Sequence, residues 1–279
     1  MKHITIKSVL MYMVAVILLT LGSVSASAQY YMNVVQKDGE KVRYLVSNID
    51  SIYFSDQESP VANYEYVDLG LSVKWATFNV GATKPEEYGD YYTWGETEPY
   101  YEAGYAQKFP HWKEGKFEGY SWSTYKWGSY NKMTKYCSKS NCGNEGFTDN
   151  KTTLDAADDV AHVKWGGNWR MPTMAEQDDL LNNCTWTWYS SGNTKYNGVA
   201  GYEVTSNIEG YTDRSIFLPA AGYYNDTSFY FAGSNGYYWS SSLSTGSPNY
   251  AWVLKFYDDY YRANGYSRNS GLSVRPVCP

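Results

Sequence analysis

The apolar and polar positions divide the chain into an apolar start, two helical stretches and a late series of strands. Residues 153–163 and 173–183 carry apolar side chains at intervals of three and four, which predicts helices. Thr173 and Glu176 have the spacing of a capping box at the start of the second helix. After Cys184, short apolar runs are bounded by Gly, Asn, Asp or Ser, which predicts strands. These strands are expected at 201–206, 215–221, 237–242, 250–257 and 272–277. Helices grouped before strands predict the α+β class with an antiparallel sheet.

The first 28 residues have the pattern of a signal peptide. Lys2 and Lys7 precede a run of 13 largely apolar residues, 9–21, and the sequence Ala-Ser-Ala at 26–28 follows as a cleavage site. The run is shorter than the roughly 20 residues that a spanning helix needs. We therefore expect an exported protein that begins at Gln29 after cleavage, without a membrane-spanning segment, in the periplasm, on the outer surface or secreted.

Turn signals and a change of composition predict three further parts of the chain. Residues 29–57 are expected to form a short β segment, with strands at 31–35 and 41–46 around the turn at Asp38 and Gly39 and another strand at 49–54. Residues 58–63 are expected to be a linker, and residues 64–279 one domain. Within that domain, residues 86–148 are rich in Gly, Tyr and Trp and predict long ordered loops.

Composition narrows the classes of function. The chain has 31 Tyr and 11 Trp among its 279 residues, which disfavours disorder, and its mean hydropathy of -0.55 disfavours a multi-span membrane protein. Its net charge of -6 disfavours binding to nucleic acid, which requires a basic surface. We expect no nucleic-acid partner.

Four cysteines follow the predicted signal peptide: Cys137, Cys142, Cys184 and Cys278. An even number in an oxidising compartment predicts two disulfides, for which three connectivities exist. We favour Cys137–Cys142, which closes a short loop, and Cys184–Cys278, which ties a helix end to the last strand. A metal site at the first pair is the alternative, but no further Cys or His ligand lies near it in the sequence.

Several phrases, in order along about 210 residues, resemble the Fibrobacter succinogenes major paralogous domain, a family common in exported proteins of Bacteroidetes and Fibrobacteres. The phrases are YVDLGLSVKWATFNVGA (66–82), YGDYYTWGETEP (88–99), WGGNWRMPTMAE (165–176), SIFLPAAGY (215–223), YYWSSS (237–242) and LSVRPV (272–277). The family is similar to the C-type-lectin-like fold, in which two helices flank a twisted antiparallel sheet and the chain ends meet. The resemblance implies that the strand near Tyr66 lies beside the strand at 273–277, with Cys184–Cys278 joining helix to last strand. It implies no reaction.

Enzymatic motifs are absent from the sequence, so we expect no enzyme and no cofactor. Four aspartates within eleven residues raise calcium as a lesser possibility, against the preferred interpretation that Asp155 caps a helix and the others favour its dipole. The four are Asp149, Asp155, Asp158 and Asp159. Arg170 and Arg275 lie in the family phrases and are expected to bond carbonyls or carboxylates at chain crossings.

The stretch 222–270 is rich in Tyr, Ser and Asn, with one Lys and no Glu. Tyr and Asn recognise ligands at a low cost in rotamer entropy, so we expect a ligand-binding surface on loops at 223–238 and 257–269. The expected contacts are Tyr224, Asn225, Asp226, Tyr260, Tyr261, Arg262, Asn264 and Tyr266. The leading hypothesis is a non-enzymatic adhesion or recognition protein with a glycan or protein ligand at the cell surface. The alternatives are a structural surface or pilus component and, less favoured, a glycan-active enzyme.

Overall fold

The computed structural model describes residues 31–35, 41–45, 64–100, 112–113, 116–117 and 119–279. The chain divides into two compact units, Met1–Glu58 and Ser59–Pro279. The predicted signal peptide at 1–28, the strand at 49–54 and the linker at 58–63 lie outside the described residues. In the first unit, β1 (Tyr31–Val35) and β2 (Lys41–Leu45) pair antiparallel, as the turn between them predicts.

The second unit has two described α-helices, and local capping decides where each begins. The α3 helix (Met174–Asn183) has the predicted capping box: the Thr173 hydroxyl accepts from the Glu176 amide, and the Glu176 carboxylate accepts from the Thr173 amide. The α2 helix (Val160–Trp165) begins seven residues later than predicted. Asp159, not Asp155, caps it by accepting from the His162 amide, which corrects the expectation for Asp155.

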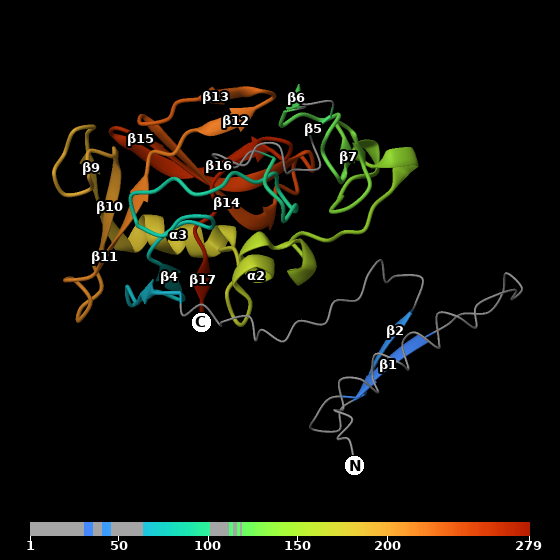
Figure 1. The fold of residues 1–279 in the computed structure, drawn as a ribbon, viewed down its shortest axis with the longest axis horizontal. Coiled ribbons are helices and arrows are strands. Elements are labelled where there is room, and N and C mark those ends of the chain that lie inside the picture. Colours follow the sequence, from blue (N-terminus) through green and yellow to red (C-terminus); the bar gives the residue numbers. More distant parts are fainter. Residues whose placement is uncertain (1–30, 36–40, 46–63, 101–111, 114–115, 118) are drawn as a thin grey trace, which may run out of the picture. The chain divides into compact units, whose positions relative to one another are not determined.

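Short antiparallel sheets dominate the rest of this unit, so the fold is α+β and mostly sheet (Figure 1). Three sheets have three strands each, in the orders β11-β10-β9, β14-β15-β16 and β17-β4-β3. Short two-stranded ladders, β5-β6, β7-β8 and β12-β13, complete the described strands. The bounds are β3 Tyr66–Val67, β4 Lys74–Ala76, β5 Trp112–Lys113, β6 Lys116–Phe117, β7 Gly128–Ser129, β8 Lys132–Met133, β9 Cys184–Tyr189, β10 Gly201–Ser206, β11 Ser215–Pro219, β12 Tyr223–Asn225, β13 Ser228–Tyr230, β14 Asn235–Leu243, β15 Tyr250–Tyr257, β16 Tyr260–Ser267 and β17 Val277–Cys278. Short 3-10 turns lie at Ser140–Cys142, Asn144–Gly146 and Ala156–Asp158.

The end of the chain meets the start of this unit at β17, which pairs with β4. Val277 lies opposite Trp75, and β4 in turn pairs with β3. The last strand is therefore one strand further from Tyr66 than the resemblance implies.

The β14-β15-β16 sheet is the element that positions the candidate site, and its two faces differ. Side chains alternate between the faces of a strand. On one face, Tyr238, Leu254 and Phe256 are buried in a core that includes Leu180 of α3. Helix α3 packs against all three strands, and Figure 1 shows it on the opposite side of the sheet from the β12-β13 hairpin. The other face carries Trp239 and is buried only at one end.

The expected binding loop at 257–269 is a strand, β16, and the expected loop at 223–238 contains β12, β13 and the start of β14. The prediction of loops is wrong because each connection is only a two-residue turn. Tyr257 pairs with Tyr260, and Asn225 pairs with Ser228. An aspartate with positive φ lies in each turn, Asp259 (62°) and Asp226 (53°), in a conformation that Asp tolerates better than most residues.

Candidate functional site

The eight predicted contact residues lie in three separate places. Tyr260, Arg262, Asn264 and Tyr266 share one face of β16, because they alternate along it, while Tyr261 is on the opposite face. Tyr261 stacks on Trp186 at 4.8 Å between ring centroids, against the α3-side core. A single ligand surface cannot include both faces of the sheet, so the expectation for Tyr261 needs correction.

The other three predicted residues belong to the β12-β13 hairpin. Tyr224 is half-buried between Tyr120 and Phe229, with ring centroids 5.3 and 4.5 Å away. Asp226 exchanges two backbone hydrogen bonds with Tyr120, and its side chain and that of Asn225 are exposed at the turn. These residues fix the hairpin to the body of the unit.

The structure instead assembles one surface of aromatic rings, which we call the tyrosine face. Its members come from the hairpin, the residue after it and the outer face of β14-β15-β16. They are Tyr223, Tyr230, Phe231, Tyr237, Tyr257, Tyr260 and Tyr266, with the cations Lys255 and Arg262. Six of the nine were not among the predicted contacts although they lie in the same Tyr-rich stretch: Tyr223, Tyr230, Phe231, Tyr237, Tyr257 and Lys255.

Buried and partly buried rings form the centre of the tyrosine face, and exposed rings form its two ends. Tyr223 packs on Tyr237 and Tyr266 at 4.9 and 5.2 Å, and burial raises the pKa of Tyr237 and of Tyr266. Phe231 is 54% exposed at the hairpin end, and Tyr257 is 39% exposed at the other. The phenols of Tyr237 and Tyr266 therefore stay protonated and neutral at ordinary pH. The three central rings hold the outer rings on a rigid base.

Two cations lie side by side on the tyrosine face. Lys255 of β15 is directly opposite Tyr237 on one side and Arg262 of β16 on the other, so all three share a row across the sheet. Lys255 Nζ is 5.4 Å from the Tyr237 ring centroid, and Arg262 Cζ is 5.1 Å from that of Tyr260. Neither cation makes a hydrogen bond or ion pair with any residue that the structure describes.

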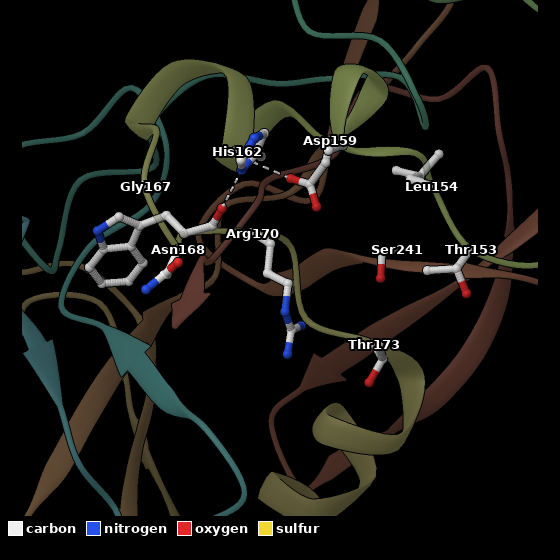
Figure 2. Close-up of a pocket in the computed structure, with 11 residues that line it drawn as sticks. Thr153, Leu154, Asp159, His162, Gly167, Asn168, Arg170, Thr173 and Ser241 are labelled. Atoms are coloured by element: carbon white, nitrogen blue, oxygen red, sulfur yellow. Dashed lines mark hydrogen bonds between the residues drawn. The ribbon is translucent and has the colours of Figure 1, made fainter. Parts of the chain in front are cut away.

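A separate pocket of about 290 Å³ lies between α2 and the start of α3 (Figure 2). Its lining includes Asp159, His162, Arg170, Thr173 and Ser241. Figure 2 shows the Arg170 side chain between Asn168 and Thr173, with Asp159 and His162 beyond it.

The polar side chains of this pocket bond mainly to backbone groups. Asp159 accepts from the His162 amide, not from its ring, and the ring Nδ1 lies 3.3 Å from the Trp169 carbonyl oxygen. Burial raises the pKa of Asp159. The Ser241 hydroxyl donates to the Pro172 carbonyl, so it has no hydrogen bond to His162. The described pocket residues therefore lack a bonded nucleophile and base, and their contacts cap helices.

The four aspartates considered for calcium are used separately. Asp149 accepts from the amides of Tyr136 and Cys137, and Asp159 caps α2. Asp155 and Asp158 pair with one lysine, Lys135. Within the described part of the chain, no three His, Cys, Asp or Glu side chains are grouped as metal ligands.

All four cysteines are buried and free in the structure, where the sequence predicts two disulfides. Cys137 and Cys142 lie in one small core, whereas Cys184 and Cys278 have different charged neighbours: Asp179 for the first, Lys74 and Arg170 for the second. Burial raises the pKa of Cys184 to about 12. Both pairings stay predictions, and four alkylated cysteines in the unreduced native protein would rule them out.

The arginines have structural contacts, as predicted for two of them. Arg170 forms a two-bond ion pair with Glu176, and the buried Arg275 donates to Asn79 and to the carbonyls of Ala76 and Phe217. Sequence reasoning missed Arg268, which is fully buried. Its guanidinium donates to the Tyr125 hydroxyl and to three carbonyls, and it lies over the Trp94 ring.

Comparison with known proteins gives one match. Residues 188–277 match the model of a family described as a domain of unknown function (DUF8237). The matched range includes the whole tyrosine face. No curated protein and no solved structure matches the chain. In the described residues, no helix has the length and apolar character to cross a membrane.

Proposed function

We propose that the Ser59–Pro279 unit is a non-enzymatic binding module of an exported protein and that the tyrosine face holds a glycan or protein ligand. The observation that carries this proposal is the set of partly exposed rings on one side of a three-stranded sheet. Tyr and Phe rings supply large contact areas and lose little rotamer entropy on binding. Strands position such groups more accurately than loops do.

The support beneath the tyrosine face favours the same function. Tyr237 is buried against Tyr223 and Tyr266, and the reverse side of the sheet packs on α3. The outer rings are therefore held in place before a ligand arrives, which reduces the entropic cost of binding.

We also propose that this unit has the C-type-lectin-like fold of the Fibrobacter succinogenes major paralogous domain. The pairing of β17 with β4 near the start of the unit supports this fold, as do the two helices.

Replacing Tyr257 and Tyr260 together by serine should weaken binding by about tenfold to a hundredfold, as loss of aromatic contacts with a ligand commonly does. The two rings stack on each other at 4.5 Å and contribute little to the core, so the thermal midpoint should change by only a few degrees. Binding would be measured for the full chain on an array of soluble polysaccharides and extracellular proteins.

The matched control is Tyr130→Ser, which removes a tyrosine that is 54% exposed and is not part of the tyrosine face. Its binding should equal that of the wild type. Unchanged affinity in the Tyr257→Ser/Tyr260→Ser variant would place the site elsewhere.

A structural or pilus component, the alternative, would instead cover the tyrosine face with a second copy. Gel filtration of the wild type is expected to show a monomer.

A further inference from the structure

We infer that the ligand of the tyrosine face is an anionic polysaccharide, whose carboxylate or sulfate groups pair with Lys255 and Arg262. This inference rests on the proposed binding function of the tyrosine face and names the class of its ligand. Lys255 and Arg262 are two like charges that lie opposite each other in the β15-β16 ladder.

Like charges directly opposite across a ladder destabilise a sheet. Here Lys255 and Arg262 are the only Lys or Arg residues in the stretch 222–267, and the same stretch contains no Glu. Because Lys255 pairs with Arg262 across the β15-β16 ladder, the two cations lie in one row of one face. Neither has an acidic partner among the described residues. Asp258 and Asp259, in the turn beside them, are exposed and make no ion pair with either cation. An anionic group bound between the two cations would remove their repulsion.

The rings hold these cations in position. Lys255 lies against Tyr237 and Arg262 against Tyr260, at distances typical of cation–π contacts. Arg262 is exposed and Lys255 is half-buried, so both charged groups remain accessible from the solvent side of the face. An arginine fork beside a lysine suits a carboxylate or sulfate group, which accepts hydrogen bonds from both.

The surface around the cations suits sugar rings better than a peptide. Peptides commonly add a strand to a sheet edge or fill an apolar groove. The tyrosine face is the broad side of a sheet, and its aromatic rings carry phenol hydroxyls. Asn235 lies in the same row as Tyr257 and Tyr260 and donates to the Tyr237 hydroxyl at 3.3 Å. Ring faces can contact the C–H groups of a sugar while hydroxyl and amide groups bond its hydroxyls.

The test is a titration of the full chain with four defined polymers. These are polygalacturonate, the same polymer with its carboxylates methyl-esterified, chondroitin sulfate, and poly-glutamate. The ester keeps the sugar backbone and removes the charge. Chondroitin sulfate carries sulfate groups besides carboxylates, whereas polygalacturonate carries carboxylates alone. The charge variant is Lys255→Gln/Arg262→Gln. The control Lys84→Gln/Lys132→Gln removes two exposed cations elsewhere.

Wild type and control are expected to bind polygalacturonate or chondroitin sulfate, and to bind the ester about tenfold more weakly, as the loss of two partly exposed charge pairs implies. The affinity of the charge variant for the acidic polymer should be about tenfold lower than that of the wild type, and its thermal midpoint should be unchanged or higher. The acidic-polymer affinity should also fall as salt is raised.

Other results would overturn the inference in distinguishable ways. Equal binding of acid and ester, lost only in Tyr257→Ser/Tyr260→Ser, would leave a binding face without charge recognition. Binding to poly-glutamate alone would make the ligand an acidic peptide. Failure to bind either acidic polysaccharide would exclude the proposed class. If, in addition, the tyrosine variant binds the array like the wild type, the proposed function fails as well.

Discussion

Replacing Arg268 by leucine should lower the free energy of unfolding by about 3–5 kcal/mol, because it leaves buried polar groups without partners. The Arg268 guanidinium is fully buried and donates to the carbonyl oxygens of Lys135, Tyr136 and Pro248 and to the Tyr125 hydroxyl. Apart from Pro248, these groups lie more than 100 positions from Arg268 along the chain. One side chain therefore joins the Tyr-rich early region to the end of β16.

Urea unfolding of Arg268→Leu, Arg268→Lys and Arg214→Leu measures this effect. The lysine variant keeps the charge but has three donors in place of the guanidinium fork, so it should also be markedly less stable. Arg214 is exposed, and its substitution should change the free energy of unfolding by less than about 0.5 kcal/mol. An Arg268→Leu variant within 1 kcal/mol of the wild type, on the order of one ordinary hydrogen bond, would contradict the proposed role.

Raising the pH above 10 should unfold the Ser59–Pro279 unit in one steep transition. Burial raises the pKa of many phenols well above their ordinary value of 10, with Tyr91, Tyr92, Tyr100, Tyr125 and Tyr238 among those that are buried. In the unfolded chain these groups ionise near pH 10, so above that pH the folded state holds more protons than the unfolded state. Stability therefore falls as pH rises, by about 1.4 kcal/mol per pH unit for each phenol.

Five such phenols give a slope of about 7 kcal/mol per pH unit, which would consume an ordinary stability of 5–15 kcal/mol within about two units. Arg275 has the opposite sign: burial lowers its pKa to about 10, so above this pH the unfolded chain holds this proton more tightly than the folded state, and this group adds stability as pH rises. Tyrosinate absorbance and near-ultraviolet circular dichroism should change together. Ionisation of most tyrosines near pH 10 in a protein that keeps its circular dichroism would contradict this account.

Local signals predicted the late helix and the bounds of two late strands, whereas the strand expected at 272–277 is only the two-residue β17. The spacing of Thr173 and Glu176 is typical of a capping box, and α3 begins where this motif predicts. Strands β10 and β15 have the predicted bounds because each apolar run is bounded by turn residues. The start of α2 was misplaced because either Asp155 or Asp159 could cap a helix by its sequence position. Tertiary contacts distinguish them: Asp159 accepts from the Met171 amide, whereas Asp155 pairs with Lys135.

The binding surface was predicted from composition in the correct region but with the wrong local structure. Tyr260 to Ser267 contains Asn and Gly, which disfavour a strand locally, and pairing with β15 overrides that preference. Once β16 is a strand, its alternation places Tyr261 behind the sheet. Arg268 could not be identified, since its partners come together only through the tertiary fold.

The most direct test of the binding surface is hydroxyl-radical footprinting of the full chain, read out by mass spectrometry at individual tyrosines. The footprint is compared with and without the acidic polysaccharide, polygalacturonate or chondroitin sulfate, that binds more tightly. The account predicts that Tyr257 and Tyr260 become protected, while the exposed rings of Tyr66 and Tyr130 react as in the free protein. Protection at Tyr66 or Tyr130 with none at Tyr257 and Tyr260 would contradict it.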